Sequence, residues 1–151
     1  MSLRFPYTLN SVTRPIVPLG GRLTRPRPVL SVSLVGPANT VPQDALLDTG
    51  ADDTVFPEYI AMLAGIDLTN APTGIGAGIG PGTHVLRYAE VTLRIADTQE
   101  RREWKAWVGF TALHFRYPML GFAGFLQYFT ATFHGDREEV ELIVNSCYAG
   151  T

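Results

Sequence analysis

The chain has 151 residues, a formal net charge of −2 and a hydrophobic fraction of 46%. This length fits one domain with a real apolar core, and the composition is that of a globular protein rather than a disordered one. The near-neutral charge gives no reason to expect a nucleic-acid partner, and no apolar run is long enough to span a bilayer, so we expect neither a nucleic acid nor a membrane as partner.

The first part of the chain differs in composition from the rest. Residues 1–28 contain five prolines and a pair of glycines, and all the charged residues in this stretch are arginines: Arg4, Arg14, Arg22, Arg25 and Arg27. Such a composition discourages regular structure. We therefore predict a Pro/Arg-rich N-terminal arm over residues 1–28, with one domain over residues 29–151. The arm has acids elsewhere on the protein, or on a partner chain, as its natural contacts.

Cysteine and histidine usage argues against disulfides and metals. Cys147 is the only cysteine, so no intrachain disulfide and no cysteine-based zinc cage can form. His84, His114 and His134 lack the spacing of a metal pair on a helix. We expect no metal and no cofactor. The single cysteine and the absence of an apolar leader segment near Pro6 favour a reducing compartment, and we predict a cytoplasmic protein.

In chain order, the first half of the domain shows a strand, a turn, a second strand and a helix. Apolar and small polar residues alternate over 29–35, a turn follows at 36–39, and a short strand is expected over 44–47. Pro57 suits the start of a short helix and Gly65 its end.

The second half is expected to be mainly strands. Residues 73–82, TGIGAGIGPG, have few side chains to pack and predict a loop or hairpin tip, whereas 91–95 and 104–108 alternate and predict a hairpin. Phe122, Phe125, Leu126 and Phe129 follow helical spacing, which predicts a second short helix. Residues 131–133 and 140–144 close the chain as strands. The expected fold is all-β, a closed or partly closed arrangement of strands with one or two short helices.

One segment carries the chemistry. In ALLDTGADDTVF, residues 45–56, an apolar strand runs directly into Asp48, Thr49 and Gly50, and Asp52 and Asp53 follow. A tight turn explains the triplet alone, because Asp and Gly are favoured in turns. A carboxylate at the end of a buried strand is nevertheless costly unless something uses it or pairs with it.

The segment resembles the active-site segment of the retroviral-type aspartic proteases, the retropepsins. GIGAGIGPGTHVLRY resembles their glycine-rich flap and the strand that leaves it, and YPMLGFAGFLQYF resembles their later apolar-apolar-Gly segment. The order and the spacing of these three segments agree with the family over roughly residues 29–133. The resemblance implies an acid-protease fold, a homodimer and a peptide or protein substrate.

The resemblance also implies roles for individual residues. Asp48 from each of two subunits would share a proton and activate water for peptide hydrolysis, with Thr49 bridging the two loops and Gly50 allowing the tight turn. Ala51, Asp52 and Asp53 would lie along the substrate.

Gly78, Ile79 and Gly80 would lie at the flap over the substrate, with Ile79 expected at the tip and Ile75 as the alternative. The same glycines invite a phosphate-binding interpretation, but no P-loop lysine follows them, which disfavours it.

The chain departs from the family pattern at one point. In retropepsins the acid matching Asp52 is usually paired with an arginine in a Gly-Arg-Asp or Gly-Arg-Asn motif, whereas here Phe122 and Ala123 follow Gly121. Asp52 then either takes another cation or is solvated. The main functional alternative to an active endopeptidase is an inactive module of the same fold that dimerises or binds peptides. A small β-barrel binding protein, in which 45–56 is only a turn, is the second alternative.

Overall fold

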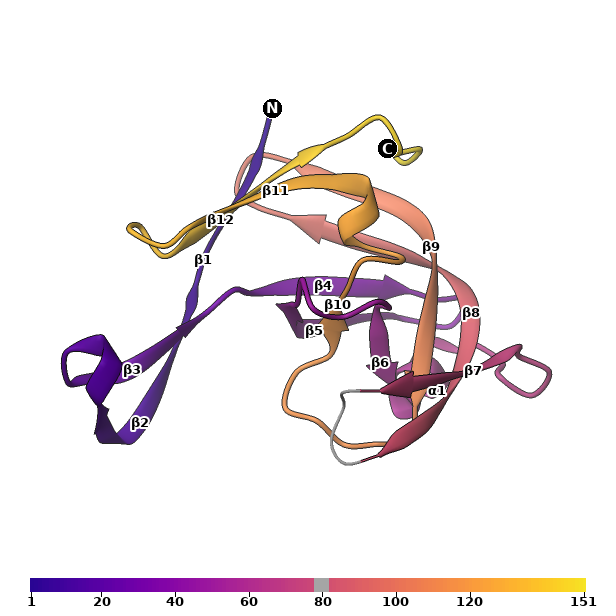
Figure 1. Ribbon diagram of the computed structural model, residues 1–151. Coiled ribbons are helices and arrows are strands. Elements are labelled where there is room, and N and C mark those ends of the chain that lie inside the picture. Colours follow the sequence, from indigo (N-terminus) through magenta and orange to yellow (C-terminus); the bar gives the residue numbers. More distant parts are fainter. Residues whose placement is uncertain (78–81) are drawn as a thin grey trace.

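The computed structural model describes residues 1–77 and 82–151, and most of its regular elements are strands (Figure 1). In chain order the elements are β1 (Leu3–Pro6), β2 (Thr8–Ile16), η1 (Val17–Leu19), β3 (Arg22–Arg27), β4 (Val29–Val35), β5 (Thr40–Leu47), β6 (Val55–Pro57), α1 (Glu58–Ala64), β7 (Thr73–Ala77), β8 (Thr83–Ala96), β9 (Arg101–Thr111), β10 (Met119–Leu120), η2 (Leu126–Tyr128), β11 (Phe129–His134) and β12 (Glu139–Val144). The predicted all-β class is confirmed. Among the described residues, no helix has the length and apolar character needed to cross a membrane.

The main sheet closes on itself. Its strands follow the order β4-β5-β10-β6-β9-β8-β7, and β4 also pairs with β8, so the described strands from β4 to β8 form a ring. The strand predicted over 29–35 is β4, and the hairpin predicted from 91–95 and 104–108 is the β8–β9 pair, with Val91 opposite Ala106. Both predictions are confirmed, and the strand expected over 44–47 is the end of the longer β5.

A smaller sheet covers one side of the ring. It has the order β1-β12-β11, and β11 and β12 form the hairpin expected near the end of the chain. Leu3 and Phe5 of β1 lie opposite Leu142 and Val140 of β12 and are buried in the main core. The first strand is therefore part of the packed body.

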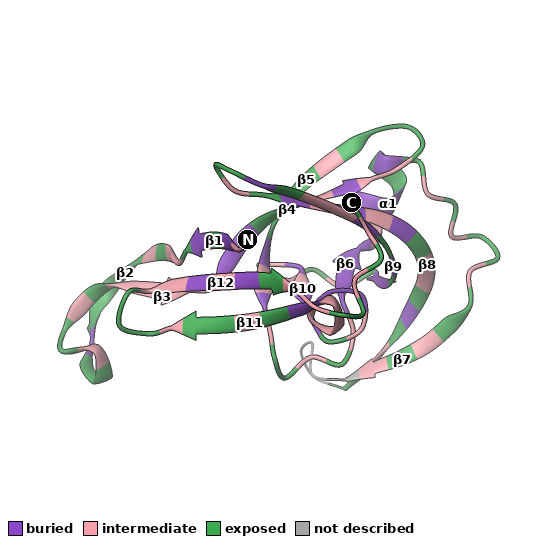
Figure 2. Cartoon of the chain, turned by 90° about the horizontal axis from the view of Figure 1, so that it is seen from above, coloured by how far each residue is buried: buried purple, intermediate pink, exposed green. Residues whose placement is uncertain are grey.

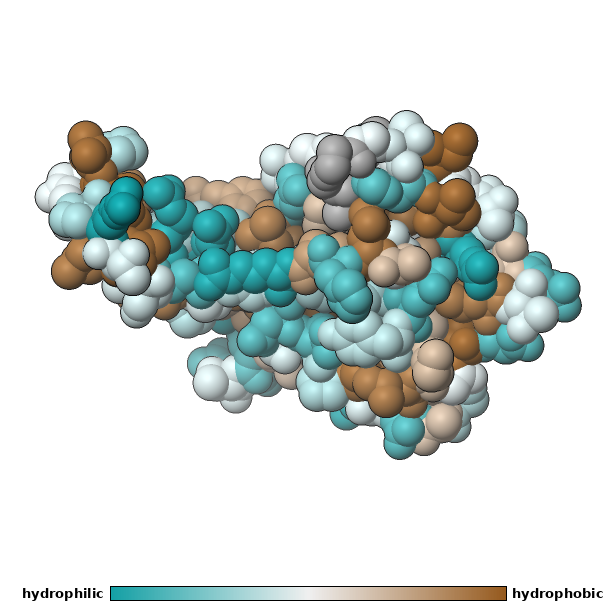
Figure 3. All heavy atoms as spheres, turned by 90° about the horizontal axis from the view of Figure 1, so that it is seen from below, coloured by the Kyte–Doolittle hydropathy of each residue, from teal (hydrophilic) through white to brown (hydrophobic). Residues whose placement is uncertain are grey.

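The sequence composition favours little regular structure over residues 1–28, and this expectation is wrong. Strands β2 and β3 form an antiparallel hairpin that projects from the body (Figure 1), and hydrophobic atoms lie on the surface of this projecting part (Figure 3). Val17, in the turn η1 between the two strands, is exposed. Proline lacks an N–H donor but is tolerated at strand edges, and each strand of this hairpin has only one neighbour among the described residues. Arg22, at the start of β3, forms an ion pair with Glu138 in the turn between β11 and β12.

The two predicted helices have different outcomes. Helix α1 is present where Pro57 and Gly65 predict it, and Gly65 ends it in the left-handed region with φ 80°. The prediction of the second helix is wrong, because only the short 3-10 helix η2 forms and Phe129 is already the first residue of β11. Gly124, with φ 90°, turns the chain just before η2.

Packing in the aromatic part of the core explains why no α-helix forms over residues 122–129 despite their helical spacing. The Trp104 ring contacts Phe125 and Phe129 edge to face, with ring centroids 5.4 and 5.2 Å apart. The Trp104 indole also donates a hydrogen bond of 3.0 Å to the Gly124 carbonyl. This packing fixes the two phenylalanines on Trp104 rather than on one helix face, and buried positions concentrate in the body rather than in the β2–β3 hairpin (Figure 2).

Candidate functional site

Asp48 stands at the end of a buried strand. Ala45 and Leu47 of β5 are buried, and the strand is flanked by the short parallel strand β10, with Leu120 opposite Leu47. The Asp48 N–H donates to the Leu120 carbonyl at 3.1 Å. The aspartate thus leaves the core from a position fixed by two neighbouring strands.

The residues after Asp48 form a tight turn around its carboxylate. The Gly50 N–H donates to Asp48 Oδ1 at 2.9 Å, and the Ala51 N–H donates to the Asp48 carbonyl at 3.2 Å. Asp48 is half-buried, whereas Thr49 and Gly50 are exposed. The structure therefore contains the turn that the sequence alone allows, with the carboxylate as one of its acceptors.

The segment after β10 clamps the other end of this loop. The Phe122 N–H donates to the Ala51 carbonyl at 2.9 Å, and the Ala123 N–H donates to the Asp52 carbonyl at 2.8 Å. The contact is close because Gly121 has no side chain: a Cβ there would lie 2.3 Å from the Asp53 carbonyl oxygen. The apolar-apolar-Gly segment thus supports the active-site-like loop directly.

Asp52 has no cationic partner among the described residues. Its side chain is exposed, and no arginine of the described residues, Arg14, Arg25, Arg27 and Arg87 included, lies within ion-pair distance of it. Arg87 instead approaches Glu58, with 3.7 Å between the nitrogen and the oxygen. Without the Gly-Arg motif, Asp52 could either pair with another cation or be solvated, and in this chain its side chain is solvated.

Asp53 has a partner that sequence reasoning missed. The Tyr88 hydroxyl donates to Asp53 Oδ2 at 2.9 Å, across 35 positions of sequence. Burial of the phenol, followed by the hydrogen bond to Asp53 and the charge of that carboxylate, raises the pKa of Tyr88 to about 12. The available signal was strand alternation in VLRY, which places Tyr88 on the same side of β8 as the buried Leu86.

A small cavity of about 90 Å³ opens beside this loop. Its wall comes from the loop, from β6, from the β7–β8 hairpin and from β10. The lining residues are Gly50, Ala51, Asp52, Asp53, Val55, Ile75, Gly76, Leu86 and Met119. The structure thus brings together four predicted site residues, Gly50 to Asp53, and Asp48 is hydrogen-bonded to the first of them, Gly50. Gly78, Ile79 and Gly80 lie outside the described residues.

The remaining polar candidates form no second cluster in the described part of the chain. No three histidine, cysteine, aspartate or glutamate side chains converge there in a way that could hold a metal ion. Cys147 is exposed and is not in a disulfide.

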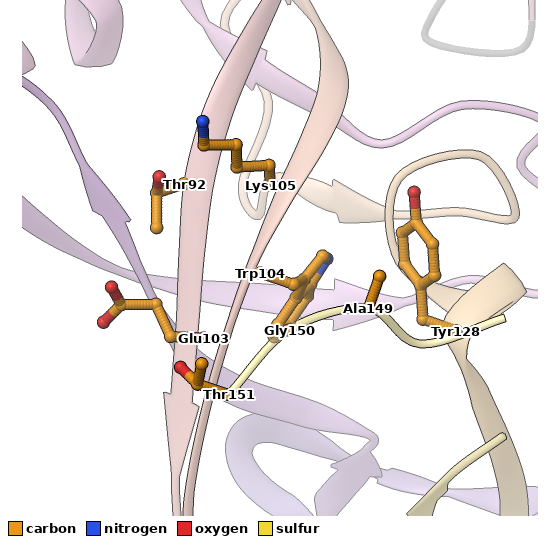
Figure 4. A pocket seen from close by; sticks show the side chains of 8 residues that line it. All are labelled: Thr92, Glu103, Trp104, Lys105, Tyr128, Ala149, Gly150 and Thr151. Atoms are coloured by element: carbon orange, nitrogen blue, oxygen red, sulfur yellow. The ribbon is translucent and has the colours of Figure 1, made fainter. Parts of the chain in front are cut away.

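A larger cavity of about 450 Å³ lies apart from the loop, over β8, β9 and the end of the chain. Thr92, Glu103, Trp104, Lys105, Tyr128, Ala149, Gly150 and Thr151 line it (Figure 4). Lys105 and Trp104 point away from each other in this view, as neighbours on a strand do. Glu103 is held by Arg94 at 2.8 Å, and the cavity shares no lining residue with the Asp48 loop.

Comparison with solved structures identifies the fold. A retropepsin-like aspartic protease from Rickettsia conorii superposes with a TM-score of 0.54 at 17% identity, covering 94% of this chain and 92% of that one. EIAV protease, solved in complex with the inhibitor HBY-793, matches with a TM-score of 0.39 at 22% identity over 63% of this chain and 81% of that one. No protein-family model matches the chain. The chain has a retropepsin-like fold.

Proposed function

We propose that the protein is an aspartic endopeptidase, a hydrolase that cleaves peptide bonds with water activated by Asp48. The observation that carries the proposal is the Asp-Thr-Gly turn, held at the end of β5 by β10 and opening onto a cavity, in a fold of the retropepsin type.

The chemistry requires two carboxylates. One chain supplies a single Asp48, so the proposed active unit is a homodimer with Asp48 of each subunit at a two-fold axis. Two carboxylates at close range share one proton, because both cannot ionise without strong repulsion. The ionised member takes a proton from the bound water, and the protonated member polarises the scissile carbonyl. No covalent enzyme intermediate forms.

Several features of the single chain fit a half-site. Thr49 and Gly50 of the Asp48 loop are exposed, and in the proposed dimer the second subunit would cover them. The cavity of about 90 Å³ is too small for a peptide segment, as expected for half of a cleft. In this proposal Thr49 bridges the two loops, and Ala51 and Asp52 lie along the substrate backbone.

The β7–β8 hairpin takes the role of a flap. Thr73 pairs with Arg87 and Ala77 with Thr83, and Ile75 and Gly76 of this hairpin already contribute to the cavity wall. Hinged hairpins of this kind exclude water when a substrate is bound. The tip residue is proposed to be Ile79. We place the enzyme in the cytoplasm, as a prediction from its single, exposed thiol.

The test is cleavage of a peptide library by the purified protein at several pH values, with products identified by mass spectrometry. The Asp48→Asn variant is measured in parallel, together with wild-type protein plus a hydroxyl-containing inhibitor that mimics the tetrahedral intermediate. Cleavage that both the substitution and the inhibitor abolish supports the proposal. Peptide binding without turnover would instead favour the inactive peptide-binding module, and cleavage that survives Asp48→Asn would remove Asp48 from the mechanism.

A further inference from the structure

The contact between Tyr88 and Asp53 joins the candidate active-site loop to the strand that leaves the hairpin. Asp53 belongs to the loop and forms a parallel bridge with Ala123, so its backbone is fixed by the segment after β10. Tyr88 belongs to β8, and its hydroxyl donates to Asp53 Oδ2 at 2.9 Å. The carboxylate is therefore held from two independent parts of the fold.

The tyrosine ring has a defined seat. It lies over two glycines: a Cβ added at Gly74 would come within 2.6 Å of Tyr88 Cε2, and one added at Gly109 would lie 3.5 Å from Cε1. Gly109 is also the direct cross-strand neighbour of Tyr88. A Cβ at Gly74 would enter the space of the ring, whereas one at Gly109 would only reach van der Waals contact, so it is Gly74 that leaves room for the phenol to reach Asp53.

The hydrogen bond leaves the charge of Asp53 uncompensated. A neutral hydroxyl donates a proton to one carboxylate oxygen but carries no positive charge. No cation of the described residues lies within ion-pair distance of Asp53, and the adjacent Arg87 is directed to Glu58. An ionised carboxylate of this kind is a strong acceptor for a charged donor that arrives with a ligand.

The surroundings of Asp53 in the cavity are apolar. Val55, Leu86 and Met119 line the same wall, and Val55 and Leu86 are buried. Lysine and arginine side chains match such a site, because their aliphatic stems pack on apolar surface while the charged group reaches a polar end.

We propose that Tyr88 positions Asp53 as a specificity-determining residue, so that this pocket selects a substrate residue with a lysine or arginine side chain. The inference rests on the proposed peptidase function and names the substrate class of that site. Tyr88 acts here through Asp53 as a positioning residue, and Asp53 makes the contact with the substrate.

The experiment uses peptides that share one sequence, selected from the library by cleavage or, if none is cleaved, by binding. They differ at one position, which carries lysine, norleucine or glutamate. Wild-type enzyme is expected to favour lysine over norleucine in kcat/KM by about tenfold or more, the size expected for a charge-assisted hydrogen bond. In Asp53→Asn the ratio should fall to near one. In Tyr88→Phe the KM for the lysine peptide should rise more than the KM for the norleucine peptide.

Matched controls come from the same residue types elsewhere on the surface. Tyr59 is 48% exposed on α1, and Asp136 is exposed in the turn between β11 and β12. Tyr59→Phe and Asp136→Asn should leave the lysine preference unchanged. A lysine preference that persists in Asp53→Asn overturns the inference, as does a Tyr88→Phe variant in which all three peptides are affected equally.

Binding separates this inference from the peptidase proposal. Fluorescent versions of the peptides are titrated with the Asp48→Asn protein, and anisotropy reports affinity without turnover. If wild-type enzyme cleaves but the Asp48→Asn protein binds lysine and norleucine peptides equally, the inference fails and the peptidase proposal stands. If nothing is cleaved but lysine peptides bind selectively, the peptidase proposal fails and the pocket assignment stands.

Discussion

Replacement of Gly121 by alanine is expected to disturb the Asp48 loop more than its small size suggests. The new Cβ would lie 2.3 Å from the Asp53 carbonyl oxygen and 2.6 Å from the Ala51 carbonyl oxygen. Both obstacles are backbone atoms, so no side-chain rotation relieves the contact. Overpacking of this kind costs about 1–3 kcal/mol, and the upper half of that range is expected here. For a chain of this size that corresponds to a fall in Tm of about 4–12 °C.

The assay is thermal unfolding followed by circular dichroism, with Gly135→Ala as the control. A Cβ at Gly135 meets nothing within 4 Å, so its effect should stay within about 0.5 kcal/mol. Peptide cleavage should fall in Gly121→Ala at temperatures where the variant is still folded, because the displaced strand supports the loop at Ala51 and Asp53. If the two alanine variants melt at the same temperature, the close packing of Gly121 on the loop is wrong.

Three further predictions address the core, the pH dependence and the candidate catalytic residue. Trp104→Phe removes the indole bond to the Gly124 carbonyl and should lower the free energy of unfolding by about 1–3 kcal/mol in urea titrations. Because the pKa of Tyr88 is raised from 10.0 to about 12 in the folded protein, its stabilising contribution is complete below pH 10 and is lost as the pH rises towards 12; Tyr88→Phe should lack this part of the alkaline loss of stability. Asp48→Asn should keep the wild-type Tm, since the amide oxygen can still accept the turn hydrogen bond, while cleavage falls by orders of magnitude.

Strand alternation predicts much of this fold because it depends on neighbouring residues. The β8–β9 hairpin and the β11–β12 pair carry alternating apolar positions and polar turns, and their positions follow from the sequence. Helix α1 is equally local, with Pro57 before it and Gly65 after it. The β2–β3 hairpin was missed because its prolines break the usual pattern without preventing pairing at exposed edges.

In the candidate site, too, local features could be predicted from the sequence and long-range contacts could not. The turn at Asp48 depends on residues next to it in the chain and could be predicted from the sequence. The bond between Tyr88 and Asp53 depends on how β8 passes the loop, which no local pattern encodes. The prediction of a second helix was wrong for a related reason. Phe125 and Phe129 pack on Trp104, which is distant in the sequence, and do not form one face of a helix.

Subunit mixing tests the central claim most directly, because one catalytic aspartate per chain makes activity a property of the pair. Wild-type and Asp48→Asn chains are co-incubated in equal amounts, exchange is confirmed by mass spectrometry of tagged chains, and initial cleavage rates are measured. With random pairing about one quarter of the dimers are wild-type, so activity per wild-type chain should drop to about half its unmixed value. Unchanged activity per wild-type chain despite confirmed exchange would mean that each subunit works alone, which contradicts the shared aspartate pair.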